Sequence, residues 1–203
     1  MCPTPQRPAD PPGRPSGRSP IHRHWPAGGE AAPQEETRAD VGMLVASLYP
    51  GSASRRARAL VREVLQGAGV PGADVADAET VVAELAANCE RHGRPPYEIR
   101  LYSLGDLPTW CEVVDGDPDL RWIPAVLDRP RDQTVLDLFA ENGRGLHLVR
   151  ELSQGHCHAY PTTIFTTGVP AKAVAFGLPT RSGLRVTCPP LLHLARHRAR
   201  LLL

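Results

Sequence analysis

Three polar side chains, Glu84, Asn88 and His92, recur every four residues in the segment 84–93, whose sequence is ELAANCERHG. In a helix this spacing places them along one face. An amide oxygen is a ligand that suits Mg²⁺, and a carboxylate one turn away can take a proton from a hydroxyl group. The same spacing is common on solvated helix faces, so this segment alone leaves both interpretations open.

A second candidate is an apolar run that ends in a carboxylate, Val113-Val114-Asp115, followed by Gly116-Asp117-Pro118. A carboxylate at a strand end can accept a hydrogen bond from an exocyclic amine of a ligand. Asp, Gly and Pro are also the residues that ordinary turns favour. The alternative interpretation is therefore a turn that ends a strand and binds nothing.

The third candidate is the segment 141–149, ENGRGLHLV, in which Gly143 and Gly145 precede a short apolar stretch. Glycine allows a ligand to approach the backbone closely, and the N-terminus of a helix attracts phosphate through its free N–H groups. A tight entry into a helix would need the same residues. The two interpretations stay open when this segment is taken alone.

Helical periodicity predicts two consecutive helices that would carry the first candidate. Ser52 is a suitable N-cap for a helix over 52–66, and Gly67 is a suitable stop. Asp74 can cap a second helix, which ends near Gly93. The predicted apolar faces are Ala53, Ala57, Leu60, Val61, Val64 and Leu65 in the first, and Ala78, Val82, Leu85, Ala86 and Cys89 in the second.

Runs of β-forming residues between turn residues predict four strands, over 97–103, 110–115, 156–166 and 172–178. The first two form a hairpin about Gly105-Asp106. The irregular segment 116–142 is long for a connection and is interpreted as a lid, and a helix is expected over 145–152. This order predicts an α+β fold, a two-layer sandwich of a mainly antiparallel sheet with helices on one face.

The flanks differ from the predicted domain over 43–179. Residues 1–42 hold nine prolines and no apolar period, which predicts a disordered arm. Trp25 is there either as an incidental exposed aromatic or as a docking anchor. Residues 180–203 form a basic tail without acidic residues. It is either a frayed terminus or a helix, begun at Pro189-Pro190, that docks on a partner.

Composition excludes several classes of protein. The net charge of +1 argues against a general nucleic-acid binder, and no apolar run approaches the length that spans a bilayer. The N-terminus does not resemble a signal peptide, and the five cysteines contain no C-x-x-C pair, so reduced thiols and a cytoplasmic location are expected.

The sequence also argues against two other kinds of binding site. Lys172, the sole lysine, precedes Ala173, which excludes a Walker A loop. His156-Cys157-His158 has zinc-ligand chemistry but fits no closed zinc module.

Taken together and in order, the three candidates resemble the ATP-binding domain shared by gyrase and histidine kinases, the GHKL superfamily. The chain resembles most closely the anti-sigma-factor serine/threonine kinases of actinomycetes. The matching patterns are E-L-x-x-N-x-x-x-H-G over 84–93, the strand ending at Asp115, G-R-G-L-x-L-V over 143–149, and K-A-V-A-F over 172–176. The resemblance covers about residues 45–179 and implies the Bergerat-type ATP-binding fold.

The resemblance implies a role for each matched residue. Glu84 would be the catalytic base, Asn88 the Mg²⁺ ligand, and Asp115 with Gly116 the contact to the adenine amine. The phosphates of ATP would be lined by Gly143, Arg144, Gly145 and Leu146. Arg91 and His92 would lie near the nucleotide.

The implied function is a kinase that phosphorylates an anti-sigma-factor antagonist in a partner-switching system controlling a sigma factor. The partners would be that antagonist, the sigma factor or both, without direct nucleic-acid contact, and a homodimer stays open.

Departures from the family pattern favour an alternative, a non-catalytic nucleotide-sensing or protein-binding regulator. Asp117 stands where the superfamily has glycine, the lid has no second glycine run, and Ala171-Lys172 replaces Gly-Lys.

Overall fold

The computed structural model describes residues 41–128 and 144–185, together with the backbone of residues 197–202. The first 40 residues of the predicted arm, including Trp25, lie outside the described residues. So do most of the predicted lid, with Gly143, and the Pro189-Pro190 segment of the tail.

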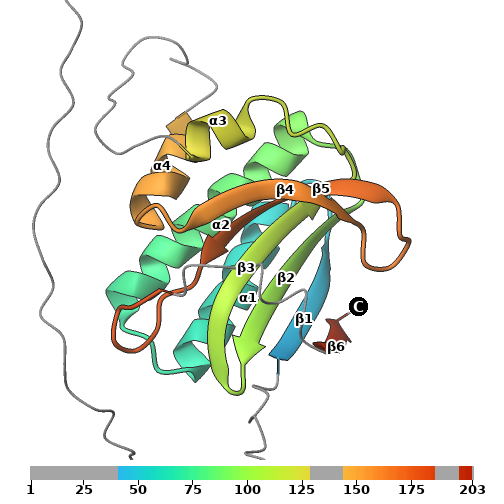
Figure 1. The fold of residues 1–203 in the computed structure, drawn as a ribbon. Coiled ribbons are helices and arrows are strands. Elements are labelled where there is room, and N and C mark those ends of the chain that lie inside the picture. The colour runs from blue at the N-terminus through green and yellow to red at the C-terminus, as the bar shows by residue number, and fades with distance from the viewer. Residues whose placement is uncertain (1–40, 129–143, 186–196, 203) are drawn as a thin grey trace, which may run out of the picture. The chain divides into compact units, whose positions relative to one another are not determined.

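A six-stranded sheet runs in the order β4-β5-β3-β2-β1-β6. Its strands are β1 (Val41–Leu48), β2 (Tyr97–Leu104), β3 (Leu107–Asp115), β4 (Cys157–Thr163), β5 (Pro170–Gly177) and β6 (His197–Leu202). The pairs are antiparallel except for β1 with β6, which are parallel (Figure 1). The mainly antiparallel sheet predicted from the sequence is therefore confirmed.

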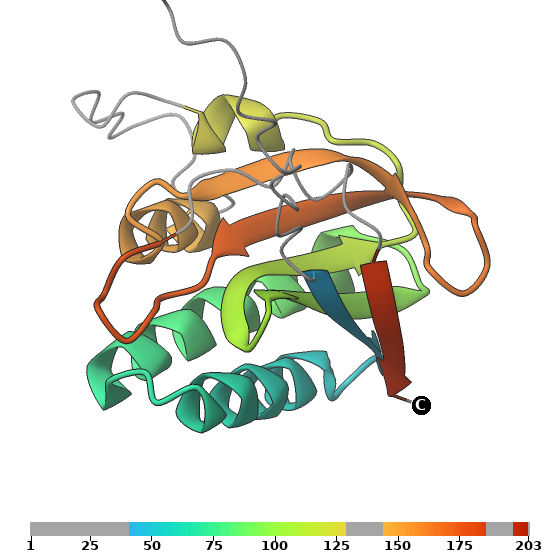
Figure 2. The ribbon, with the colours of Figure 1, turned by 60° about the horizontal axis from the view of Figure 1, so that its bottom comes forward.

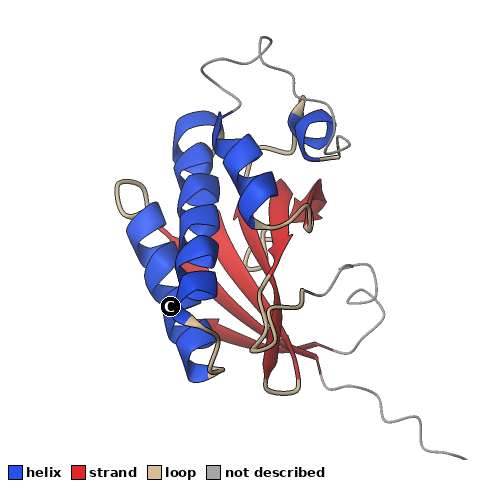
Figure 3. Ribbon diagram, turned by 90° about the vertical axis from the view of Figure 1, so that its left-hand side faces the viewer, coloured by secondary structure: helices blue, strands red, loops and turns tan. Residues whose placement is uncertain are grey.

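Three helices, α1 (Ala53–Gly67), α2 (Gly72–His92) and α4 (Arg144–Leu152), cover one face of this sheet (Figure 3). A short fourth helix, α3 (Ile123–Leu127), packs near α4 and β4. The arrangement is the two-layer α+β sandwich that the order of elements predicted.

The two long helices form because their apolar residues recur at helical spacing and meet the sheet and each other. In α1 the buried residues are Ala53, Ala57, Val61 and Leu65, and Leu60 and Val64 are half-buried at the edge of that stripe. In α2 every residue of the predicted face is buried. On the solvent side, Arg62 donates from Nη2 to Oε2 of Glu79 over 2.7 Å and links the two helices.

The helix ends differ from the prediction. Gly67 belongs to α1, whose C-cap is Ala68, and the left-handed φ of +71° falls at Gly69 instead. Asp74 lies in the first turn of α2, which begins two residues earlier, after Pro71. Ser52 occupies the N-cap of α1, but its hydroxyl donates to the carbonyl of Tyr49 over 3.2 Å and makes no cap hydrogen bond. These helix ends are set by tight backbone turns, which residue propensities alone do not predict.

Three elements were not predicted. Strand β1 occupies 41–48, so its first two residues fall in the segment assigned to the arm, and α3 lies inside the predicted lid. In the tail, residues 197–202 form β6, which runs beside β1 at the edge of the sheet (Figure 2).

Strand register brings distant residues to one end of the sheet. Tyr97 at the start of β2 pairs with Asp115 at the end of β3. On the other side of β3, Asp115 pairs with Lys172 of β5. Helix α2 ends directly before β2, so Gly93 and Asp115 also lie together at this end.

Candidate functional site: a pocket between the second helix and the sheet

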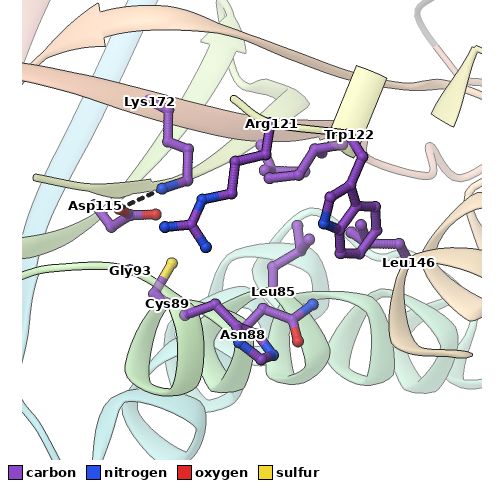
Figure 4. Close-up of a pocket in the computed structure, with 12 residues that line it drawn as sticks. Leu85, Asn88, Cys89, Gly93, Asp115, Arg121, Trp122, Leu146 and Lys172 are labelled. Carbon is purple, nitrogen blue, oxygen red and sulfur yellow. Dashed lines mark hydrogen bonds and ion pairs between the residues drawn. The ribbon is translucent and has the colours of Figure 1, made fainter. Parts of the chain in front are cut away.

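A cavity of about 160 Å³ lies between α2, the end of β3, the first half of β5, the start of α3 and the start of α4 (Figure 4). Four residues predicted for the site line it, namely Asn88, His92, Asp115 and Leu146. The other lining residues are Leu85, Cys89, Gly93, Arg121, Trp122, Ile123, Lys172 and Val174. The cavity is smaller than the ~300–1,000 Å³ of pockets for whole drug-sized ligands, so it suits a base more than an entire nucleotide.

Asp115 is buried at the floor of this pocket. Three donors converge on its Oδ1: Nζ of Lys172 over 2.8 Å, the backbone N–H of Asp117 over 3.0 Å and that of Arg94 over 3.4 Å. These donors fix the carboxylate plane, and its other oxygen points toward the middle of the pocket (Figure 4). That oxygen is an acceptor suited to an amine of a bound ligand.

Cys89 of α2 lies beside Asp115 and is a neutral thiol. Burial is the main cause that raises its pKa well above the ordinary range, and the negative charge of Asp115 raises it further. The side chain therefore behaves as a small apolar wall of the pocket and not as a nucleophile.

Lys172 was not among the predicted site residues. Besides Asp115, its Nζ donates to the carbonyl of Asp117 over 3.0 Å and lies 3.5 Å from Oδ2 of the same residue. Burial alone would raise the pKa of Asp117, but the N–H of Asp119 and the charge of Lys172 outweigh it and hold that pKa below its ordinary value. Asp117 thus places a second buried carboxylate beside Lys172, next to the pocket.

At the other end of the pocket, the start of α4 packs on the polar face of α2. A Cβ added to Gly145 would lie 2.8 Å from Oε2 of Glu84 and 3.5 Å from Nδ2 of Asn88, so a larger residue would displace the end of the Glu84 side chain. Arg91 donates from Nη2 to Oδ1 of Asn88 over 3.2 Å and lies 3.9 Å from Oε2 of Glu84. The carboxylate and amide therefore lie beside the first N–H groups of a nine-residue helix, an arrangement that attracts anions.

Not every predicted site residue reaches the pocket. Gly116 is packed against the loop before β2, where its N–H donates to the carbonyl of Arg94 over 2.7 Å. Arg144 is exposed as the first residue of α4, and Gly143 lies outside the described residues. Glu84 and Arg91 lie next to Asn88 without lining the cavity itself. The structure shows these positions, and the roles assigned to the residues stay predictions.

Sequence reasoning also missed the segment that carries Arg121, Trp122 and Ile123. A signal for it was present, because aspartates recur at every second position from Asp115 to Asp119. Such spacing is typical of successive turns in which each carboxylate accepts the N–H two residues on. The structure contains these turns, and they direct the chain across the mouth of the pocket.

The donor set fits Mg²⁺ better than a metal held by a full protein cage. The described residues contain no group of three or more His, Cys, Asp or Glu side chains able to hold a metal ion. Mg²⁺ needs few protein ligands, because water and phosphate oxygens complete its octahedron. The amide oxygen of Asn88, with the Glu84 carboxylate one turn away, meets that need.

The zinc alternative gains no support among the residues that the structure describes. Cys157 is buried, and His158 instead stacks on Trp110 with ring centroids 6.3 Å apart. Nδ1 of His158 also lies 3.6 Å from Oδ1 of Asp128. In the same described part of the chain, no helix has the length and apolar character needed to cross a bilayer.

A family model, that of the histidine kinase-like ATPase domain, matches residues 50–161, which is more than half of the chain. The match contains Glu84, Asn88, Asp115, Gly145 and Leu146, and it stops before β5 and Lys172. The search of curated proteins found no match.

Proposed function

Because the chain belongs to the histidine kinase-like ATPase domain family, an ATP-binding family, we propose that it is a serine/threonine kinase. Its proposed substrate is an anti-sigma-factor antagonist in a partner-switching system. The observation that supports this most is the assembly of Asn88, Asp115 and Leu146 in one pocket, with Glu84 directly beside Gly145. An adaptor without catalysis needs no carboxylate at the N-terminus of α4.

In the proposed complex, adenine enters the cavity with its amine donating to the open oxygen of Asp115. Lys172, buried between Asp115 and Asp117, keeps the Asp115 carboxylate oriented through the 2.8 Å contact of its Nζ. Leu85, Leu146 and Val174 provide apolar contact to the ring. The phosphates then extend toward the first N–H groups of α4, as anions do at helix N-termini.

Glu84 is the proposed general base. Its carboxylate takes the proton of the attacking serine or threonine hydroxyl, while the hydroxyl oxygen bonds to the γ-phosphorus and the bond to the β-phosphate oxygen breaks, which releases ADP. Oδ1 of Asn88 would hold Mg²⁺, which neutralises phosphate charge when bound. Arg91, which donates to that oxygen over 3.2 Å, must release it for this.

The proposed partners are the antagonist and the sigma factor that the kinase alternately holds in the cytoplasm. This part of the proposal follows the resemblance of the segments 84–93 and 143–149 to the actinomycete kinases. A homodimer is compatible with it.

A second candidate is a nucleotide-sensing regulator that does not transfer phosphate. Two observations favour it. Arg91 occupies the amide oxygen of Asn88, and Asp117 fills with ion pairs a position that is glycine in the superfamily. The Arg91 hydrogen bond and the Asp117 ion pairs would change the surroundings of a bound nucleotide, and the pocket remains.

The two candidates differ in one assay. The purified chain is incubated with labelled Mg-ATP and antagonist proteins encoded near its gene, beside the Glu84→Gln variant and the Glu63→Gln control on the exposed side of α1. The kinase proposal expects Glu84→Gln to transfer phosphate ~10²- to 10⁴-fold more slowly, because a general base contributes that much, and to bind ATP normally. Glu63→Gln should match the wild type.

Equal phosphate transfer by Glu84→Gln and the wild type would remove Glu84 from the mechanism. If neither transfers phosphate while both bind ATP, the nucleotide-sensing regulator is the better account.

A further inference from the structure

A series of turns leads the chain from the end of β3 to the mouth of the pocket. Oδ1 of Asp115 accepts the N–H of Asp117 over 3.0 Å, and Oδ1 of Asp117 accepts the N–H of Asp119 over 3.3 Å. Oδ1 of Asp119 accepts the N–H of Arg121 over 2.9 Å. Each turn is fixed by a carboxylate two residues back, so the position of Arg121 follows from three side chains in sequence.

Arg121 has an uncommon backbone conformation. Its φ of +50° is in the left-handed region, which side chains other than glycine adopt rarely and at a cost of about 1–3 kcal/mol. An exposed turn with no further role would be more stable with glycine here. The conformation turns the side chain back over the pocket, which it lines (Figure 4).

The guanidinium is held in place by two of the same carboxylates. Its Nε lies 3.3 Å from Oδ2 of Asp119 and its Nη2 lies 3.6 Å from Oδ2 of Asp117. Both contacts lie along the edge of the planar group, so its faces stay available for packing. In Figure 4 the guanidinium lies between the Asp115–Lys172 pair and Asn88, with Trp122 beyond it.

We propose that the guanidinium of Arg121 forms one wall of the base site and stacks on the face of the purine ring of the bound nucleotide. The inference rests on the nucleotide-binding part of the proposed function and adds a residue that contacts the base. Arginine stacks well on aromatic faces, because it is planar and only weakly hydrated.

Charge argues for the base and against a phosphate as the group that Arg121 meets. This end of the pocket holds the cations Lys172 and Arg121, with Arg94 near Asp117, and the anions Asp115, Asp117 and Asp119, so three positive and three negative charges cancel. An anionic phosphate gains no net attraction there, and a neutral ring needs none. The N-terminus of α4, which attracts phosphate, lies at the other end, at Gly145.

The test compares the full chain with Arg121→Gly and Arg121→Lys in titrations of ATP, ADP and AMP. Glycine suits the left-handed backbone, so Arg121→Gly should fold, which a thermal melt checks. Lysine keeps the charge and lacks the planar face. If the guanidinium stacks on the base, both variants lose affinity by about 3- to 30-fold, and by the same factor for all three nucleotides. Arg58→Lys on exposed α1 is the control and should change nothing.

Three results would overturn the inference. An affinity loss that shrinks from ATP to AMP would make Arg121 a phosphate ligand, and full affinity in Arg121→Lys would make charge and not the planar face decisive. Unchanged affinity in Arg121→Gly would show that Arg121 does not contact the nucleotide. The kinase proposal is tested separately by phosphate transfer, so either can fail without the other.

Discussion

At the scale of single residues, Gly145 is a conspicuous position, because it lies against Glu84, the proposed catalytic base. It was predicted as a phosphate-lining glycine, and the structure shows a further reason for it, the 2.8 Å that a Cβ would leave to Oε2 of Glu84. A methyl group there displaces the end of a flexible side chain, which is inexpensive for stability. The same displacement moves the proposed catalytic base.

We therefore expect Gly145→Ala to separate stability from activity. Alanine is the better helix former by roughly 0.5–1 kcal/mol, so thermal stability should stay equal or rise slightly. Phosphate transfer should fall at least about tenfold, because catalysis is sensitive to misplacement of about 1 Å. Gly72→Ala at the start of α2 is a matched control, since a Cβ there meets no atom within 4 Å. Unchanged transfer in Gly145→Ala would argue against Glu84 as the base.

Spacing in the sequence located part of the pocket and missed the rest for a physical reason. Asn88 and His92 share a helix face, and Asp115 ends a strand, so local patterns marked these residues as candidates. The resemblance to the ATP-binding family assigned them to a nucleotide site and added Leu146. Lys172 reaches the pocket only through the register of β5 on β3, which is a pairing between residues 57 positions apart. A local reading of the sequence contains no signal for such a contact.

At the scale of elements, α1 is attached to the rest of the domain by the row of buried apolar side chains along one of its faces. Leu65 is fully buried in this stripe, and Leu60 on the same helix is only half-buried. Because protein cores are closely packed, truncation of a fully buried side chain such as Leu65 leaves a cavity. The two leucines therefore offer the same chemical change in two environments.

Leu65→Ala should lower the free energy of unfolding by about 2–5 kcal/mol, the range for leucine truncation in a packed core. Leu60→Ala should cost clearly less, because part of its side chain is already in water. Urea unfolding of both variants measures the difference. Equal losses would mean that α1 does not pack as described.

The two strands at one side of the sheet, β1 and β6, were not predicted. Strand β1 is a continuous apolar run, VGMLVASL, without the alternation that indicates a half-buried strand. Strand β6 is basic and pairs in parallel with β1, about 150 residues earlier in the chain, so neither composition nor a hairpin turn indicated it. The hairpin of β2 and β3, joined through Gly105-Asp106, was confirmed because its signal is local.

At the scale of the whole molecule, acid stability should depend on the buried charges of the pocket. The pKa of Asp117 is held below its ordinary value in the folded state. Its stabilising contribution is therefore complete above the pKa of the unfolded chain, near 4, and is lost as pH falls through the lower folded value.

Asp117→Asn should accordingly lower the free energy of unfolding at pH 7 by about 1–3 kcal/mol, the cost of leaving buried partners unsatisfied. The gap to the wild type should narrow as pH falls from about 5 toward 2. Denaturant midpoints across this range measure it, with Asp106→Asn in the exposed hairpin as control. A gap that stays constant or widens on acidification would contradict the depressed pKa.

The central claim is that the pocket floored by Asp115 binds the base of ATP. Calorimetric titration of Mg-ATP into the wild type and Asp115→Asn tests it most directly, with Asp106→Asn at the opposite end of β3 as the matched control. The account predicts a micromolar dissociation constant for the wild type and the control, on the order of −5 to −8 kcal/mol. Asp115→Asn should bind at least about tenfold more weakly, because the amide can turn its NH₂ group toward the adenine amine. Equal affinity of Asp115→Asn and the wild type would place the base elsewhere and contradict the account.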